Sequence, residues 1–271
     1  MQKQATARKV IAIVQEIRNI ISRIGTRKLY YMLKDKLCKL NVGRDKLFRI
    51  LKANHMLIKR KRSYHITTDS HHRFRKHKNI ACNIDIKRPE QVWVSDITYI
   101  GTRDNPYYLA LITDAYSKMI VGYNVSKSLA VEGSIKALVM ALKTRKYNNE
   151  PLIHHSDRGL QYCSNDYQDL LKVNQIQSSM TEKYDPYENA IAERINGILK
   201  QEFSINRLTK NYEIKSKLVK QAIDTYNKIR PHLSNNMLTP MQMHAQRKLK
   251  RKTYKTKVLN EASFIENKIL F

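Results

Sequence analysis

The sequence has 271 residues, enough for one large domain or about two to three small ones. Hydrophobic residues make up 42% and charged residues 27%, with only 7 glycines and 6 prolines, which excludes a largely disordered or fibrous chain. The longest apolar runs fall far short of the ~18 to 20 residues that span a bilayer, so no membrane partner is expected. The 3 scattered cysteines form no disulfide framework and indicate a reduced, cytoplasmic compartment.

The net charge of +28, from 51 basic and 23 acidic side chains, predicts a polyanionic partner. This charge is unevenly distributed. Residues 1–82 hold 22 basic and 4 acidic side chains, and residues 205–271 hold 15 and 4, whereas residues 83–204 hold 14 and 15. Two basic arms therefore flank a central segment that keeps its carboxylates, which indicates that the central segment needs acids.

The N-terminal region is predicted to be helical. Apolar residues recur at helical spacing over residues 5–22, 27–37 and 44–53, with a break near Asn41 and Gly43. Two short helices around such a turn suit a helix-turn-helix that lays its second helix in the major groove of DNA. A plain three-helix bundle with a solvated basic face explains the pattern equally well. In the first interpretation the outward cations of the last helix are DNA contacts: Arg44, Lys46, Arg49 and Lys52.

The segment that follows is polar and basic, without a sustained period, and is predicted to be a linker or extended arm. His71, His72 and His77 with Cys82 could suggest zinc. A structural zinc site usually needs four ligands with a second close cysteine, however, and the sequence offers none there. A phosphate-contacting arm fits better.

The central segment predicts a mixed sheet with flanking helices. Three β-rich runs at 92–100, 107–114 and 119–125 are separated by turn residues, and strands at 151–156 and 176–180 alternate with helices at 129–142 and 165–173. A further helix is expected from Asp185, as its N-cap, to about Phe203. Residues 208–230 and 239–252 are predicted to be mostly helical, with Thr239 and Pro240 as cap and first turn.

Three acids of this segment occupy positions suited to a metal site. Strand alternation places Asp96 on the same face as Val92 and Val94, where an unpaired carboxylate is costly. Asp157 follows a buried strand, and Glu193 lies on the polar face of the last core helix with Asn189, Asn196 and Lys200. Oxygen-rich sets of this kind bind Mg²⁺ or Mn²⁺, and two such ions can drive displacement at phosphorus. Each acid alone has an ordinary structural explanation.

The spacing favours the functional interpretation. Between Asp96 and Asp157 lie 60 residues, and between Asp157 and Glu193 lie 35. This pattern resembles the Asp-Asp-35-Glu catalytic core of retroviral integrases and of bacterial insertion-sequence transposases, in particular the downstream-frame product of the IS-three family. The surrounding words strengthen the resemblance: WVSDITYI at 93–100, TDAYSK at 113–118, HHSDRG at 154–159, NA at 189–190, YN at 226–227, RPH at 230–232 and LTP at 238–240.

The resemblance implies a ribonuclease-H-like α/β core in a metal-dependent DNA transposase. The expected organisation is a helix-turn-helix-like domain at 1–64, a basic linker at 65–88, the integrase catalytic core at 89–204 and a basic helical region at 205–271. Asp96, Asp157 and Glu193 are expected to bind two Mg²⁺ or Mn²⁺ ions and to catalyse strand cleavage and transfer. Lys200, Asn189 and Arg158 are expected to contact DNA.

The implied partners are double-stranded DNA at element ends and targets, further copies of the chain on DNA, and the upstream-frame protein or a frameshift fusion with it. The implied location is the cytoplasm of a bacterium, in association with the nucleoid. One alternative is a non-catalytic DNA-binding regulator of a fused transposase. Another is a plain ribonuclease or junction nuclease, which the large basic flanks disfavour. The terminal repeat recognised, the target preference and the oligomeric state are not encoded in any motif.

Overall fold

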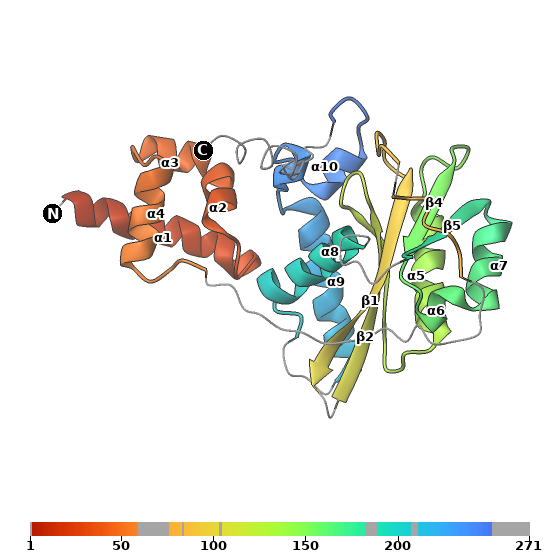
Figure 1. The fold of residues 1–271 in the computed structure, drawn as a ribbon. Coiled ribbons are helices and arrows are strands. Elements are labelled where there is room, and N and C mark those ends of the chain that lie inside the picture. Colours follow the sequence, from red (N-terminus) through yellow and green to blue (C-terminus); the bar gives the residue numbers. More distant parts are fainter. Residues whose placement is uncertain are drawn as a thin grey trace, which may run out of the picture.

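The computed structural model describes residues 2–58, 76–82, 84–102, 105–182, 189–206 and 211–250. A helical N-terminal part lies beside an α/β part built on one sheet, with the last helices stacked between them (Figure 1). The predicted histidines 71 and 72 and the predicted N-cap Asp185 lie outside the described residues. None of the described helices is both long and apolar enough to cross a membrane.

Four helices form the N-terminal part: α1 (Gln2–Ile20), α2 (Thr26–Met32), α3 (Lys34–Lys39) and α4 (Arg44–Ala53). Their apolar stripes meet in one core that includes Val10, Val14, Leu29 and Leu47. The single helix predicted at 27–37 is interrupted at Leu33, whose φ of −103° and ψ of 11° leave the helical region. Leu33 and Leu37 both lie in the shared core, as they would in one continuous helix, so periodicity alone could not reveal the break.

The sheet confirms the predicted strands: β1 (Val92–Thr102), β2 (Asn105–Asp114), β3 (Ile120–Ser126), β4 (Leu152–Ser156) and β5 (Ile176–Met180). Its strand order is β3-β2-β1-β4-β5. The first three strands are antiparallel neighbours, whereas β4 pairs in parallel with β1 and β5 in parallel with β4. This mixed sheet with helices on both faces is a ribonuclease-H-like arrangement.

Helices cover both faces of the sheet (Figure 1). On one face lie α5 (Val131–Thr144), α6 (Leu160–Cys163) and α7 (Asn165–Val173), which pack with Trp93 and Ile97 of β1. On the other lie α8 (Ala190–Glu202) and α9 (Tyr212–Lys228), which pack with Leu109 and Leu111 of β2. Gly122 allows the close approach of α5, because a Cβ at that position would collide with the carbonyl oxygen of Ala137.

The C-terminal elements are shorter than predicted. A 3₁₀ turn, η1 (Leu233–Asn235), precedes α10 (Pro240–His244), which ends well before residue 252. The predicted cap is confirmed: the Thr239 hydroxyl accepts from Gln242 N, and the Gln242 side chain accepts from Thr239 N. Helix α9 shares its apolar core with the sheet, so residues on both sides of position 204 stabilise one cluster.

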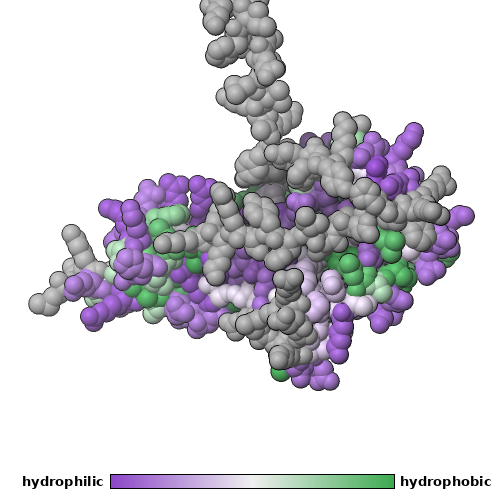
Figure 2. Space-filling view, turned by 60° about the horizontal axis from the view of Figure 1, so that its bottom comes forward, coloured by the Kyte–Doolittle hydropathy of each residue, from purple (hydrophilic) through white to green (hydrophobic). Residues whose placement is uncertain are grey.

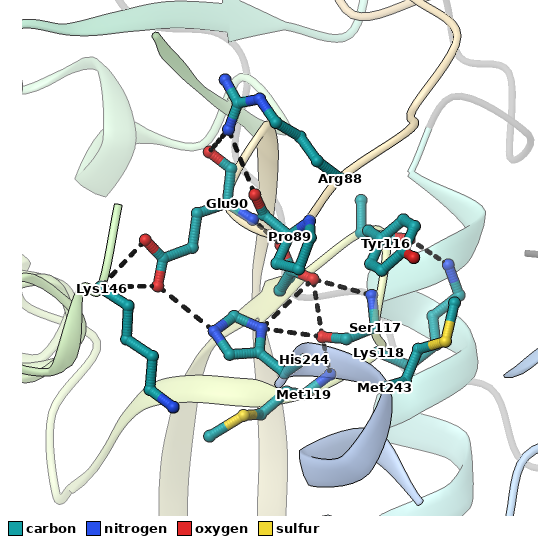
Figure 3. Close-up of polar contacts among 12 residues, drawn as sticks. Arg88, Pro89, Glu90, Tyr116, Ser117, Lys118, Met119, Lys146, Met243 and His244 are labelled. Atoms are coloured by element: carbon teal, nitrogen blue, oxygen red, sulfur yellow. Dashed lines mark hydrogen bonds and ion pairs between the residues drawn. The ribbon is translucent and has the colours of Figure 1, made fainter. Parts of the chain in front are cut away.

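A buried polar network attaches α10 to the sheet (Figure 3). His244 Nε2 lies 3.2 Å from Glu90 Oε1, and His244 Nδ1 lies 3.6 Å from Asp114 Oδ2. Ser117 donates to the same Asp114 oxygen from its backbone N at 2.7 Å and from its hydroxyl at 2.6 Å. Burial alone would lower the pKa of His244, but its contacts with Asp114 and Glu90 prevail and raise that pKa to about 9. His244 is therefore an imidazolium at neutral pH.

This network predicts that the free energy of unfolding falls as pH rises from 6.5 to 9. Because the folded pKa exceeds the unfolded value, the stabilisation is complete below pH 6.5 and is lost as pH passes through about 9. The loss is on the order of 3 kcal/mol. Urea unfolding of the wild-type chain and of His244→Gln at a series of pH values measures it. The variant should be less stable at pH 6 and should lack this decline; parallel curves for the two proteins would contradict the assignment.

A second network joins the N-terminal helices to α8. Glu202, the last residue of α8, binds Arg230 through two contacts of 2.8 and 2.7 Å and lies 3.5 Å from Lys28 of α2. The Glu202 carbonyl oxygen accepts from Arg23 N and from the Ser22 hydroxyl. Burial and the nearby Arg230 lower the pKa of Lys28 to about 8, although Glu202 opposes this. The outer surface of the N-terminal helices, on the left of Figure 2, is largely hydrophilic.

Candidate active site

Strand β1 directs Asp96 toward α8, as alternation predicted. Val94 and Val92, two and four positions earlier, pack with Ala192 of α8, whereas Trp93 and Ile97 pack on the opposite face. Asp96 is partly buried at the middle of the strand, opposite Leu111 of β2. The carboxylate is therefore presented between the sheet and α8.

Parallel pairing brings the end of β4 toward Asp96. Val94 of β1 is opposite His155 of β4, the last pair of this ladder, and the charge of Asp157, two residues after His155, acts on Asp96, two residues after Val94. Asp157 directly follows β4, and its Oδ1 accepts from Gly159 N at 3.0 Å. The edge at which a parallel strand ends is the usual place for a site in an α/β sheet.

Helix α8 supplies the third acid and an amide that fixes the first. Glu193 is exposed in the first turn, and Asn196, one turn later, is buried. The Asn196 side-chain nitrogen donates to Asp96 Oδ2 at 2.6 Å. Asn196 was recognised in the sequence only as part of the polar face of this helix. Its contact with Asp96 depends on the packing of α8 against β1, which no local pattern encodes.

The charges of Asp157 and Glu193 act on Asp96. Burial, followed by the charges of Asp157 and Glu193, raises the pKa of Asp96 to about 7, although the hydrogen bond from Asn196 opposes the shift. Burial also raises the pKa of Glu193. Burial lowers the pKa of Lys200, while the negative charge of Asp96 opposes that change. The negative charges at this site are therefore close enough to raise the energy of the Asp96 carboxylate, and a bound cation would offset that cost.

The donor chemistry fits a hard divalent cation, but the carboxylates are not gathered into a finished cage. Within the described part of the chain, no group of three or more His, Cys, Asp or Glu side chains lies close enough to hold one ion. Mg²⁺ is usually bound by only one or two carboxylates, with water and substrate phosphate completing its shell. The neighbouring Asp96 and Asp157 carboxylates meet that requirement, and Glu193 lies near enough to influence Asp96.

A buried histidine links the two strands next to the first two acids with α7. The Ser95 hydroxyl lies 2.6 Å and the Tyr167 hydroxyl 2.9 Å from His154 Nε2, so β1, β4 and α7 meet at one buried ring. Burial, followed by the charge of His155, lowers the pKa of His154 to about 3. Sequence reasoning used this histidine only as part of a motif.

The predicted DNA contacts are placed in different settings. Lys200 lies on α8 near Asp96, and Arg158 directly follows Asp157. Asn189 is 7% exposed, and its side-chain nitrogen donates to the Ser95 carbonyl oxygen at 3.1 Å, so it anchors the start of α8 to β1. That placement gives no support to its predicted contact with DNA.

The predicted cations of α4 all face solvent. The sequence placed Arg44, Lys46, Arg49 and Lys52 on the outer side of this helix, and each is exposed. Arg44 Nε donates to Asp45 Oδ1 at 2.9 Å, and Lys46 Nζ donates to the Asn41 carbonyl oxygen at 3.3 Å. Leu47 and Leu51 occupy the buried side. The helix therefore offers a basic outer face, as both earlier interpretations of the region require.

The fold and the acidic edge together define a ribonuclease-H-like core of the integrase type. Models of the family described as "Integrase core domain" match residues 86–186 and 174–240. A cryo-EM structure of a simian T-cell lymphotropic virus intasome, in complex with PP2A regulatory subunit B56 gamma, shares the fold with a TM-score of 0.51 and 20% identity. That similarity covers 86% of this chain and 79% of the viral one.

Bacterial relatives give the family. An insertion element IS600 protein of 31 kDa from Shigella sonnei, described as uncharacterized, is 35% identical over 218 residues, covering 80% of this chain and 79% of the relative. Transposase InsF for insertion sequence IS3A, from Escherichia coli strain K12, is 36% identical over 155 residues, covering 57% of this chain and 54% of the relative. The chain belongs to the IS3 family of insertion-sequence transposases.

Proposed function

We propose that this chain catalyses divalent-metal-dependent cleavage and strand transfer of DNA at the ends of an insertion sequence. The observation that carries the proposal is that the charges of Asp157 and Glu193 both act on the buried Asp96 carboxyl, whose pKa burial and these charges raise to about 7. Such a cluster of like charges is unfavourable unless it serves to bind a cation.

Each residue of the site has a distinct role in this proposal. Asp96 and Asp157 would hold a shared Mg²⁺ or Mn²⁺ ion, and Glu193 would help to hold a second. When bound, two such ions activate an attacking oxygen and stabilise the leaving one in displacement at phosphorus. Asn196 fixes the orientation of the Asp96 carboxylate by its hydrogen bond of 2.6 Å. Lys200, on the same helix, would hold a DNA phosphate beside the acids.

The rest of the molecule supplies the means to grip DNA. The net charge of +28 favours binding to the phosphate backbone of DNA, because basic side chains release the counterions condensed on it. The exposed basic face of α4 would contact one DNA segment, and Arg158 would lie near the reacting strand. Strand transfer requires that two DNA ends be held close to each other. We therefore expect further copies of the chain to assemble on DNA, with the upstream-frame protein as another partner.

The test is strand cleavage and transfer on oligonucleotides that carry the ends of the element. We expect products with Mg²⁺ or Mn²⁺, none after chelation by EDTA, and full recovery when the ion is restored. An Asp157→Asn variant should lose activity by at least about 10³-fold, since a ligand to the proposed ions is removed, while it keeps its affinity for DNA. Asp169→Asn, an exposed aspartate on α7, serves as the matched control.

The same assay decides between enzyme and regulator. A non-catalytic DNA-binding regulator would bind the ends with a similarly steep dependence on salt but would yield no metal-dependent product. Full activity of Asp157→Asn would contradict the assignment of the acids.

A further inference from the structure

A segment that precedes the sheet binds the end of β5 and reaches the apolar cluster at the start of α8. We call residues 76–82 and 84–86 the strap. The Lys78 carbonyl oxygen accepts from Met180 N at 3.4 Å, and Asn79 N donates to the Glu182 carboxylate at 2.8 Å. His77 N donates to Met180 Sδ at 3.5 Å. The strap therefore begins at the end of β5, the last strand before α8.

One buried hydroxyl fastens the middle of the strap. Ser179 of β5 is 0% exposed, and its Oγ accepts from Ile80 N at 3.1 Å and from Ala81 N at 3.2 Å. The same oxygen lies 2.9 Å from His155 Nδ1, on the strand that ends at Asp157. A single side chain thus connects the strap to both parallel strands beneath the site.

The far end of the strap packs against the start of α8. Its side chains Ala81, Ile84 and Ile86 contact a buried cluster formed by Val92, Val94, Ala115 and Ala192. Ile191 joins the same cluster, so the two residues that precede Glu193 are both in it. The chain after Ile86 is held in turn, because Lys87 N donates to Gln91 Oε1 and Gln91 Nε2 donates to the Asp85 carbonyl oxygen.

The first turn of α8 is thereby fixed from two sides. Asn189 ties it to β1 at Ser95, and the strap covers its apolar side at Ile191 and Ala192. Glu193 itself is exposed, and among the described residues no hydrogen bond or ion pair orients its carboxylate. The position of its carboxylate therefore depends on how firmly this turn is held.

We propose that the strap is a positioning element for Glu193, with Ser179 and Ile84 as its positioning residues. This inference rests on the proposed function for its catalytic consequence, but its structural content can be measured without activity. The strap holds the first turn of α8 at a fixed distance from the Asp96 and Asp157 edge. Loosening the strap should leave the sheet and the DNA-binding surfaces intact.

Hydrogen exchange of the full chain, without metal or DNA, tests the structural part. In Ser179→Ala and Ile84→Ala we expect the hydrogen-bonded amides at 193–196 to exchange about tenfold faster than in the wild-type chain, since one hydrogen-bonded or packed anchor is lost. Amides of β1 and β2 should be unchanged. Ser178→Ala on the same strand, and Ile80→Ala, whose side chain is 40% exposed, should match the wild-type chain.

Cleavage assays test the catalytic part. The same two variants should need about tenfold more Mg²⁺ for half-maximal cleavage and should keep the wild-type dissociation constant for end-bearing DNA. Unchanged exchange at 193–196, or a Mg²⁺ requirement equal to that of the control variants, would overturn the proposal. If Ile84→Ala exchanges faster throughout the chain, the milder Ile84→Val decides, with the same two readouts. A wild-type chain that cleaves no DNA would refute the proposed function, while the exchange result would still decide whether the strap holds α8.

Discussion

Replacing Asp96 with asparagine is expected to abolish cleavage and, at the same time, to stabilise the folded chain. Cleavage should fall by at least about 10³-fold, because the amide cannot serve as an anionic ligand. The stability gain follows from the pKa of about 7, which burial and the charges of Asp157 and Glu193 impose on Asp96. When the folded pKa of a carboxyl exceeds its unfolded value, the protein loses unfolding free energy as pH rises from about 4 to 7. At pH 7.5 the Asn variant avoids this loss and should be more stable by on the order of 2 kcal/mol.

Chemical unfolding and cleavage assays on the same preparations measure the two effects. Asparagine can still accept the hydrogen bond from Asn196, so the change removes charge and leaves the packing. Mg²⁺ should raise the melting temperature of the wild-type chain more than that of the variant, because the ion binds the folded state. Asp169→Asn should alter neither cleavage nor stability. A variant that is less stable than the wild-type chain would show that the three acids do not repel one another.

Arg230→Met is expected to cost about 3 to 5 kcal/mol of unfolding free energy, the usual cost of breaking a buried ion pair. Arg230 is 1% exposed and donates from Nε and Nη2 to the Glu202 carboxylate, while its Nη1 lies 2.9 Å from His232 Nε2. Its loss leaves the Glu202 carboxylate, which is mostly buried, with Lys28 as its remaining cation. Urea unfolding at pH 7 measures the effect.

The matched control is an ion pair of the same type at the surface. Lys36 and Glu16 lie 3.0 Å apart with side chains 58% and 61% exposed. Lys36→Met should change stability by less than about 1 kcal/mol, because water screens exposed pairs. Equal losses in the two variants would mean that the Glu202 network contributes no more than a surface contact.

The strands of the fold could be predicted because each combines alternation with clear turn residues at its ends. The strand at 92–100 was correct in type and in the face that its side chains present. Helix ends were less predictable, since they depend on partners distant in sequence. Helix α2 ends at Met32 although the helical spacing of apolar residues continues to Leu37, and the start of α9 at Tyr212 was predicted four residues too early.

The site was predicted through its spacing and motifs, whereas its supporting contacts were not. Nothing near Asn196 in the sequence indicates that its amide reaches Asp96 across about 100 residues of chain. The same is true of Glu90, Asp114 and His244, which meet in one buried network although each has an ordinary local setting. Long-range pairs of this kind are decided by the packing of whole elements, for which a single sequence carries no local signal.

Helix α8 has the third acid at its beginning and the joint with the N-terminal helices at its end. Glu193 and Glu202 are nine residues apart, or about 14 Å at the usual rise of an α-helix. A helix of this length moves as a stiff rod. A rotation of the N-terminal helices relative to the sheet must therefore have one of two effects. Either the contacts of Ser22, Arg23 and Lys28 with Glu202 break, or Glu193 moves together with the N-terminal helices.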